Sequence, residues 1–195
     1  MKLLLTLTLL FSLVFATDSL KEKYPLLSQK TINYYEEVSK TVPTIDKMYN
    51  NFKNLSKDEK KELKTKVKAL FPLKFITEYQ KLGDDALKEF YSLYFWLINY
   101  KAYILVDKYY DDYDFLEGKI LATLVHKFNP SGISYTDTYL WSLVRAKEYD
   151  EPLAEYPKLL KRVKNTVIKQ ELQEHYNYVL EQEQLKYKKF QKVKL

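Results

Sequence analysis

The chain has 195 residues, of which 46% are apolar, and its 32 Lys and Arg residues against 26 Asp and Glu residues give a net charge of +6. It contains no Cys, which excludes disulfides, thiol catalysis and metal sites with Cys ligands. Its three isolated Gly residues exclude glycine-rich turns that cradle phosphates or dinucleotides. With so few Gly residues and 30% charged residues, the composition favours long helices over a sheet protein with many turns.

The N-terminus has the pattern of a secretory signal peptide. Lys2 supplies a positive charge, residues 3–15 form an apolar stretch, and Val14 and Ala16 are small residues at the positions that signal peptidase reads. The apolar stretch is shorter than the ~20 residues that a membrane-spanning helix needs. We therefore expect residues 1–16 to be a signal peptide cleaved after Ala16, residues 17–195 to form the mature domain, and the protein to be secreted.

Apolar residues at helical spacing predict helices through the first part of the mature chain. The first helix covers residues 20–39, and a short segment over residues 44–52 follows it. Ser56 and Glu59 have the spacing of a capping box, so a further helix begins there and ends before Pro72.

The next two helices include the most aromatic part of the sequence. A short helix over residues 73–82 ends at Gly83, and a long helix runs from residue 86 to about residue 110. Residues 90–106 are apolar nearly all round, but Asn99 and Lys101 would be costly in a bilayer. We expect a buried central helix, or one that lines a cavity, rather than a membrane span.

The second half of the chain continues the helical pattern. An acidic connector over residues 111–114 leads to a helix over residues 115–128, with Leu116, Ile120, Leu124 and Phe128 at a spacing of four. After a loop at residues 129–132, another helix begins near Thr136. A single long helix is predicted from Pro157 to about residue 193.

These elements predict an all-α fold: a single domain of seven or eight amphipathic helices around a central aromatic helix, able to enclose an apolar cavity. No strand pattern, internal repeat or domain boundary is present.

Motifs for catalysis or metal binding are absent from the sequence. The acidic run fails the calcium-loop template, because the fifth and sixth positions counted from Asp112 are Leu116 and Glu117. The chain has two His residues, His126 near a helix C-terminus and His175 among Glu residues, and we expect both to be surface or satisfied side chains. We predict no catalytic residue, no metal site and no cofactor.

Two surface features indicate contacts or modification. Asn54 begins the only N-glycosylation sequon, just before the capped helix, and is the predicted glycosylation site. Five Lys residues in residues 186–194 either complement the dipole of a helix end or dock the C-terminal tail transiently on an anionic membrane surface. No nucleic-acid recognition motif is present, so we expect no nucleic-acid partner.

The large supply of aromatic residues, 19 Tyr and 10 Phe, exceeds what a compact helical core requires. Rings concentrated on one helix hold neighbouring helices apart, and Tyr hydroxyls at a cavity mouth could bind a lipid headgroup. The alternative is a tyrosine-rich but solid core.

The segment Phe52–Lys64, together with the Tyr-rich first helix and Leu93-Tyr94, resembles the nematode fatty-acid- and retinol-binding proteins. In that family a similar stretch opens a helix and carries a sequon. The resemblance implies a secreted all-α carrier with an internal cavity for fatty acids and retinol. It covers only a short segment, and the final lysine-rich helix has no counterpart.

We therefore predict a secreted helical carrier that binds fatty acids, retinol or similar lipids without a covalent bond. Lys66, Lys74 or Lys101 could supply the cation for a carboxylate. The alternative is a secreted interaction or effector protein with a solid core and no small-molecule ligand. The predicted lipid-binding residues are Leu63, Val67, Phe75, Phe90, Leu93, Tyr94, Leu97, Tyr103, Leu121, Leu124 and Val125.

Overall fold

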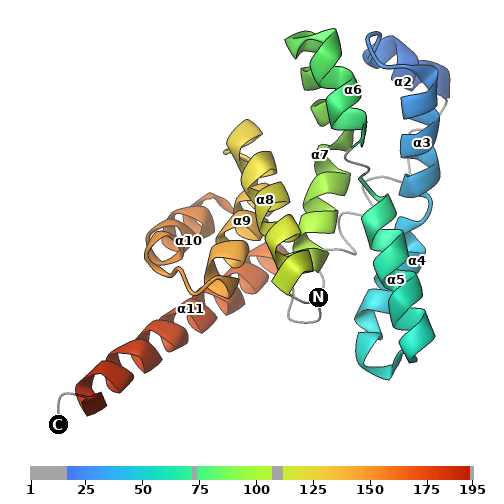
Figure 1. Ribbon diagram of the computed structural model, residues 1–195. Coiled ribbons are helices and arrows are strands. Elements are labelled where there is room, and N and C mark those ends of the chain that lie inside the picture. Colours follow the sequence, from blue (N-terminus) through green and yellow to red (C-terminus); the bar gives the residue numbers. More distant parts are fainter. Residues whose placement is uncertain (1–16, 72–73, 107–111, 194–195) are drawn as a thin grey trace. The chain divides into compact units, whose positions relative to one another are not determined.

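The computed structural model describes residues 17–71, 74–106 and 112–193, and every regular element within these ranges is a helix (Figure 1). The predicted all-α fold class is confirmed. The predicted signal peptide and its cleavage after Ala16 lie outside the described residues. None of the helices in the described ranges is long and apolar enough to cross a membrane. The elements are α2 (Thr17–Lys23), α3 (Gln29–Ser39), α4 (Val42–Asn50), the 3-10 helix η1 (Phe52–Asn54), α5 (Lys57–Ala69), α6 (Lys74–Leu82), α7 (Asp84–Val106), α8 (Asp112–Phe128), α9 (Ile133–Arg145), α10 (Asp150–Arg162) and α11 (Thr166–Val193).

These residues cluster into two compact units, which we call the N-terminal unit (residues 17–101) and the C-terminal unit (residues 102–193). The boundary falls after Lys101, inside the continuous helix α7. The sequence shows no linker there, because a helix that continues through a boundary keeps its apolar pattern.

The first predicted helix is in fact two. Pro25 lies between α2 and α3, where its missing N–H ends the helical hydrogen-bond ladder. Ser28 then caps α3 by accepting a hydrogen bond from the Thr31 backbone N–H at 3.2 Å. Pro43 lies in the first turn of α4, a position where a missing N–H costs nothing.

The predicted capping box of α5 is confirmed. The Ser56 hydroxyl accepts a hydrogen bond from the Glu59 N–H at 3.3 Å, and the Glu59 carboxylate accepts one from the Ser56 N–H at 2.7 Å. Asn54 is exposed at the end of η1, just before this cap. Gly83 separates α6 from α7 with a φ of +103°, a conformation that favours glycine.

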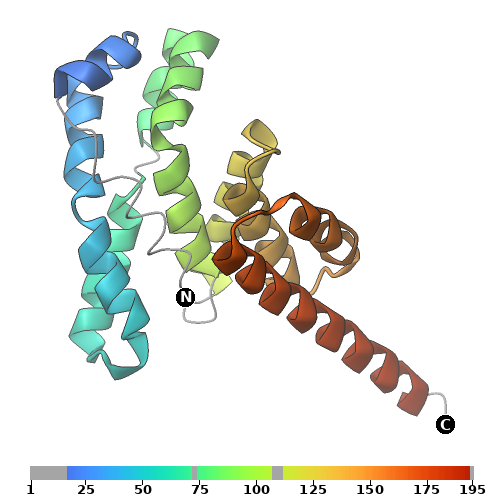
Figure 2. The same ribbon diagram turned by 180° about the vertical axis from the view of Figure 1, so that it is seen from behind.

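The C-terminal unit is built from helices that pack on their neighbours in sequence: α8 on α9, α9 on α10, and α10 on α11 (Figure 2). Gly118 permits a close approach, since a Cβ there would lie 2.8 Å from the Leu105 Cβ and 3.0 Å from the Val106 backbone N. The buried core cluster consists of Leu140, Leu143, Val144, Tyr156, Leu159, Val163, Leu172 and Val179.

Several predicted boundaries in this unit are wrong. The predicted acidic connector is partly helical: α8 begins at Asp112, and Asp114 is buried rather than solvated because it shares a helix face with Gly118. α9 begins at Ile133, three residues earlier than expected. The single helix predicted from Pro157 onward is two helices, because Pro157 lies within α10 and the chain leaves the helix after Arg162.

A new helix then begins at Thr166. The Asn165 side-chain oxygen accepts hydrogen bonds from the N–H groups of Val167 at 2.9 Å and Ile168 at 3.2 Å, which caps α11. In both views the C-terminal part of α11 extends beyond the other helices of its unit. The side chains of the basic tail lie outside the described residues.

The four-residue apolar stripe on α8 faces outward rather than toward the core. Leu116, Ile120 and Phe128 are exposed by 55%, 60% and 48%. Leu121 and Val125 take the buried positions instead, on the side of the helix where Gly118 meets α7.

Candidate functional site

The predicted lipid-binding residues belong to both units. Those of the N-terminal unit are all buried: Leu63, Val67, Phe75, Phe90, Leu93, Tyr94 and Leu97. In the C-terminal unit, Leu121 and Val125 are buried, whereas Tyr103 and Leu124 are partly exposed.

The largest part of the N-terminal set forms one cluster of rings around Phe90. We define the aromatic cluster as the residues whose rings pack on the Phe90 ring, together with Phe90 itself. The ring centroids lie 4.8 to 6.3 Å from the Phe90 centroid, which is the ordinary contact range for aromatic pairs. Its members are Phe71, Phe75, Tyr79, Phe90, Tyr91 and Tyr94.

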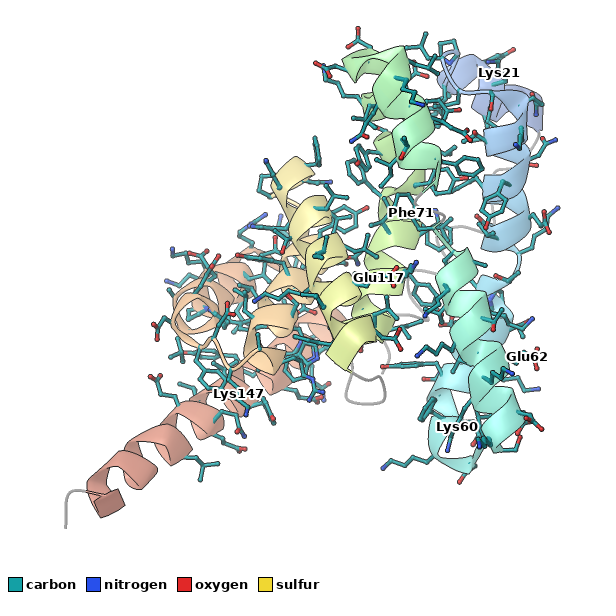
Figure 3. All side chains as sticks on the ribbon, viewed as in Figure 1. Lys21, Lys60, Glu62, Phe71, Glu117 and Lys147 are labelled. Carbon is teal, nitrogen blue, oxygen red and sulfur yellow. The ribbon has the colours of Figure 1, made fainter. Side chains whose placement is uncertain are left out.

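The rings also connect α7 to α3. The Tyr94 ring lies 5.3 Å from the Tyr35 ring, and the Trp96 indole N–H donates a 2.6 Å hydrogen bond to the Tyr35 hydroxyl. Side chains therefore join α3 and α7 through both a ring contact and a hydrogen bond. Figure 3 draws the described side chains on the ribbon, with Phe71 labelled inside the unit and Glu62 pointing away from it.

Two tyrosine hydroxyls of the cluster bind α3. The Tyr79 hydroxyl donates to the Thr31 hydroxyl at 2.9 Å and accepts from the Ser28 N–H at 2.9 Å. The Tyr94 hydroxyl donates to the Thr31 backbone oxygen at 3.0 Å, and burial raises the pKa of this hydroxyl. These hydroxyls therefore fasten α6 and α7 to the start of α3, a role that the sequence analysis did not assign to them.

The three candidate cations differ in their surroundings. Lys101 is only 2% exposed, and its ammonium donates hydrogen bonds to the backbone oxygens of Lys68 at 3.2 Å and Phe71 at 3.3 Å. Lys66 has a side chain that is 31% exposed and pairs with Glu62 at 3.3 Å. The side chain of Lys74 lies outside the described residues.

A second candidate region lies in the C-terminal unit, where Asp137 accepts two hydrogen bonds with one carboxylate oxygen. His175 Nδ1 lies 2.9 Å from that oxygen, and the Tyr156 hydroxyl donates to it at 3.1 Å. The Trp141 ring stacks on the His175 ring at 4.4 Å. We call Asp137, Tyr156 and His175 the polar triad, which joins α9, α10 and α11.

Contacts within the polar triad shift the pKa values of His175 and Tyr156. Burial opposes the charged imidazolium, but the Asp137 carboxylate and, less strongly, Glu171 outweigh it, so the pKa of His175 is raised. Burial raises the pKa of the Tyr156 hydroxyl, and the neighbouring Asp137 raises it further. His175 is therefore a satisfied histidine, as expected, and it pairs with Asp137 rather than with the Glu residues near it in sequence.

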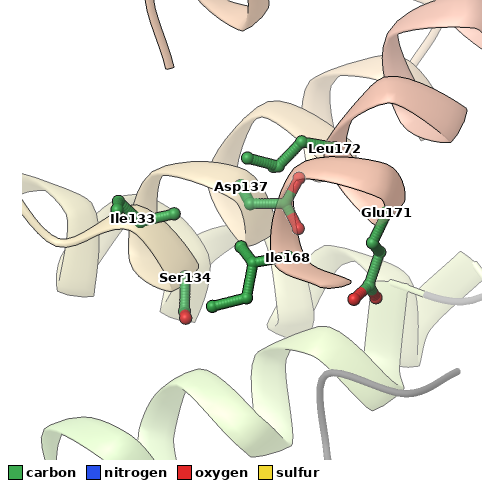
Figure 4. Close-up of a pocket in the computed structure, with 6 residues that line it drawn as sticks. All are labelled: Ile133, Ser134, Asp137, Ile168, Glu171 and Leu172. Carbon is green, nitrogen blue, oxygen red and sulfur yellow. The ribbon is translucent and has the colours of Figure 1, made fainter. Parts of the chain in front are cut away.

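A small pocket adjoins the polar triad between α9 and α11 (Figure 4). The space between its lining side chains is too small to hold even a water molecule, so it is not a small-molecule site. Burial raises the pKa of Glu171, one of its lining carboxyls. The lining residues are Ile133, Ser134, Asp137, Ile168, Glu171 and Leu172.

Sequence reasoning missed the polar triad, although a signal was present. Asp137 lies three and seven residues before Leu140 and Val144, and His175 lies between Leu172 and Val179 at helical spacing. Polar residues at apolar positions of two helices indicate a buried hydrogen-bonded group. Within the described residues, no group of three or more His, Asp or Glu side chains could hold a metal ion.

Comparison with known proteins does not identify the chain. Neither the protein-family models, nor the curated proteins, nor the solved structures include a match. The resemblance to the nematode carriers stays a prediction.

Proposed function

We propose that this protein is a secreted carrier that binds a long-chain fatty acid or a retinoid within the N-terminal unit. The observation that carries the proposal is the aromatic cluster, a buried set of rings contributed by α6, α7 and the chain just after α5. Binding sites for apolar ligands typically combine aromatic and aliphatic walls with a few polar groups.

In this proposal the ligand replaces part of the contact between rings. Rotation of Phe and Tyr side chains would open space along α7, where Leu93 and Leu97 supply further apolar surface. Burying a ten-carbon chain at about 0.8 kcal/mol per methylene contributes about 8 kcal/mol before the entropic costs, which is compatible with micromolar binding.

The test is fluorescence titration with retinol and with a dansyl-labelled fatty acid, each followed by displacement with oleate. We expect saturable binding at micromolar protein, and weaker binding of both probes by Phe90→Ala. A suitable control is Tyr178→Ala, which removes an exposed ring from the other unit. Absence of binding by both probes would overturn the proposal.

A second function is favoured by the outward stripe on α8. Leu116, Ile120 and Phe128 form an apolar face of the kind that marks interaction sites. If neither lipid binds, we propose instead a secreted interaction protein that uses this face. Ile120→Glu should then abolish co-purification with its partner and leave the helix content, measured by circular dichroism, unchanged.

A further inference from the structure

Helix α5 and the short segment before it carry most of the protein's net positive charge. Residues 52–68 contain seven Lys residues and three acidic residues, which gives a net charge of +4, against +6 for the whole chain. Two of the three acidic side chains have partners within this segment: Glu59 closes the capping box, and Glu62 pairs with Lys66 at 3.3 Å. The segment is therefore a strongly basic part of the N-terminal unit.

Four of these lysines lie along one face of α5 and form what we call the lysine stripe. They follow one another at intervals of four, three and four residues, and at about 100° per residue they keep within about 60° of one another around the helix axis. At about 1.5 Å per residue the stripe is about 16 Å long. Glu62 and the buried Leu63 lie on other faces of the helix. The members of the stripe are Lys57, Lys61, Lys64 and Lys68.

Two members of the stripe are available to bind an anion. Lys57 and Lys61 are exposed, and neither forms an ion pair with any residue that the structure describes. Lys64 and Lys68 make contacts of their own, so they add positive charge to the stripe but do not carry the argument. Like charges four residues apart on a helix repel each other, and an anion beside Lys57 and Lys61 would remove that cost.

The chemistry of this face favours a narrow polyanionic chain as the partner. Asp58 and Glu62 lie on the side of α5 next to the stripe, so a flat anionic membrane would also meet their carboxylates, which it repels. The stripe contains no apolar side chain that could insert into a bilayer. α5 also contains no aromatic residue on which the bases of a single-stranded nucleic acid could stack.

We infer that the lysine stripe binds a linear sulfated polysaccharide, with Lys57 and Lys61 in contact with its sulfate groups. Clusters of Lys residues commonly form patches for heparin-like chains, and such a chain needs only cations spaced along its length. This inference goes beyond the carrier function and does not depend on it. Binding of this kind holds the protein at a surface or matrix that carries sulfated chains, while Leu63 and Val67 on the inward face of α5 stay in the core.

The test measures the affinity of the protein for a fluorescein-labelled heparin dodecasaccharide by fluorescence anisotropy at several salt concentrations. Binding should weaken as the salt concentration rises, because salt screens the attraction between exposed charges. The double variant Lys57→Glu and Lys61→Glu should bind at least about tenfold more weakly, because two attractive contacts become repulsive. The matched control, Lys23→Glu and Lys30→Glu, makes the same change in net charge at exposed positions of the same unit, and should lose less than about threefold.

Three results would overturn the inference. The first is a folded stripe variant that binds heparin as tightly as the wild type, or loses no more than the control does, because another part of the chain then binds the polysaccharide. The second is equal affinity for heparin from which the sulfate groups have been removed. The third is binding of phosphatidylserine vesicles or of an oligothymidine strand as tight as that of heparin at the same salt concentration. Circular dichroism checks the fold, and Lys57→Gln with Lys61→Gln replaces the stripe variant if the Glu side chains disturb it.

Discussion

The helices of the two units are held together by different kinds of contact. In the N-terminal unit, aromatic rings of α6 and α7 pack on one another and on α3, and two tyrosine hydroxyls donate hydrogen bonds to Thr31 of α3. In the C-terminal unit, the helices pack closely, as at Gly118, and a buried polar triad joins three of them. The N-terminal unit is thus held together by contacts between rings, and the C-terminal unit by close packing together with a buried polar group, which specifies one arrangement of its helices.

Each unit contains one of the two Trp residues, so the comparison can be tested one unit at a time. Trp141 reports on the C-terminal unit in a Trp96→Phe background, and Trp96 reports on the N-terminal unit in a Trp141→Phe background. Urea titrations followed by fluorescence then give the free energy of unfolding from each reporter.

The largest expected loss follows from removing the centre of the polar triad. Asp137→Ala leaves the buried His175 ring and the Tyr156 hydroxyl without their acceptor, so the unfolding free energy read by Trp141 should fall by about 3–5 kcal/mol below pH ~6.5, where the raised pKa keeps His175 charged. Glu181→Ala, which removes an exposed carboxylate from α11, is the control and should change it little. A loss below about 1 kcal/mol for Asp137→Ala would contradict a structural role for the triad.

A loss of similar size is expected in the other unit from the centre of its ring cluster. Phe90→Ala removes a ring that is 0% exposed and contacts five others, so the unfolding free energy read by Trp96 should fall by about 3–5 kcal/mol. Phe90→Leu keeps an apolar side chain and should lose clearly less. Equal losses for the two variants would argue against a ring-filled core.

Gly118→Ala tests the close packing of the C-terminal unit. The added methyl group would lie within 3.0 Å of Leu105 and Val106, so the unfolding free energy should fall by about 1–3 kcal/mol. The control Thr123→Ala changes an exposed residue on the same helix. If Gly118→Ala is as stable as wild type, α7 and α8 do not depend on this contact.

A smaller effect is expected at the capping box of the N-terminal unit. Ser56→Ala removes the acceptor for the Glu59 N–H and should cost about 1 kcal/mol, measured by the same urea titration through Trp96. Ser56→Thr keeps the hydroxyl and should retain most of the stability. Because Ser56 also completes the sequon at Asn54, Ser56→Ala removes the cap and the sequon together, and Asn54→Gln, which removes the sequon alone, is the control for glycosylation.

The smallest expected effect concerns the pKa values of the two His side chains rather than the free energy of unfolding. NMR titration of the imidazole protons should give a midpoint above about 6.5 for His175 and below it for His126, whose pKa is lowered mainly by burial. Since the pKa of His175 is raised in the fold, its pairing with Asp137 stabilises the protein fully below pH ~6.5, and this contribution is lost as the pH rises through the folded-state value. His126 has the opposite sign: its contribution is present above pH ~6.5 and is lost as the pH falls. A His175 midpoint at or below that of His126 would contradict the pairing seen in the structure.

The helical fold class and several helix ends were predictable because they depend on residues close in sequence. The Ser56–Glu59 capping box and the turn at Gly83 follow from backbone chemistry within four residues, and both are present. Two predicted helices are each two helices in the structure, with breaks at residues 24–28 and 163–165. The breaks were missed because the apolar spacing on either side of each break fits one continuous helix.

The aromatic cluster was partly predictable, and the polar triad was not predicted. Apolar spacing placed Phe90 and Tyr94 in a core, but it could not indicate that their neighbours would include Phe71 and Tyr79. Asp137 and His175 are 38 residues apart, and no local rule pairs side chains at that distance.

The sequence by itself determined that the chain is helical, where several of its helices begin, and that aromatic residues concentrate on α7, since these properties depend on local backbone chemistry and composition. Only the tertiary structure decided that Lys101 caps the end of α5 beside the rings, that Asp137 pairs with His175, and that the stripe on α8 faces outward. Burial and charge pairing depend on which helices meet, and that is set by packing between residues distant in sequence.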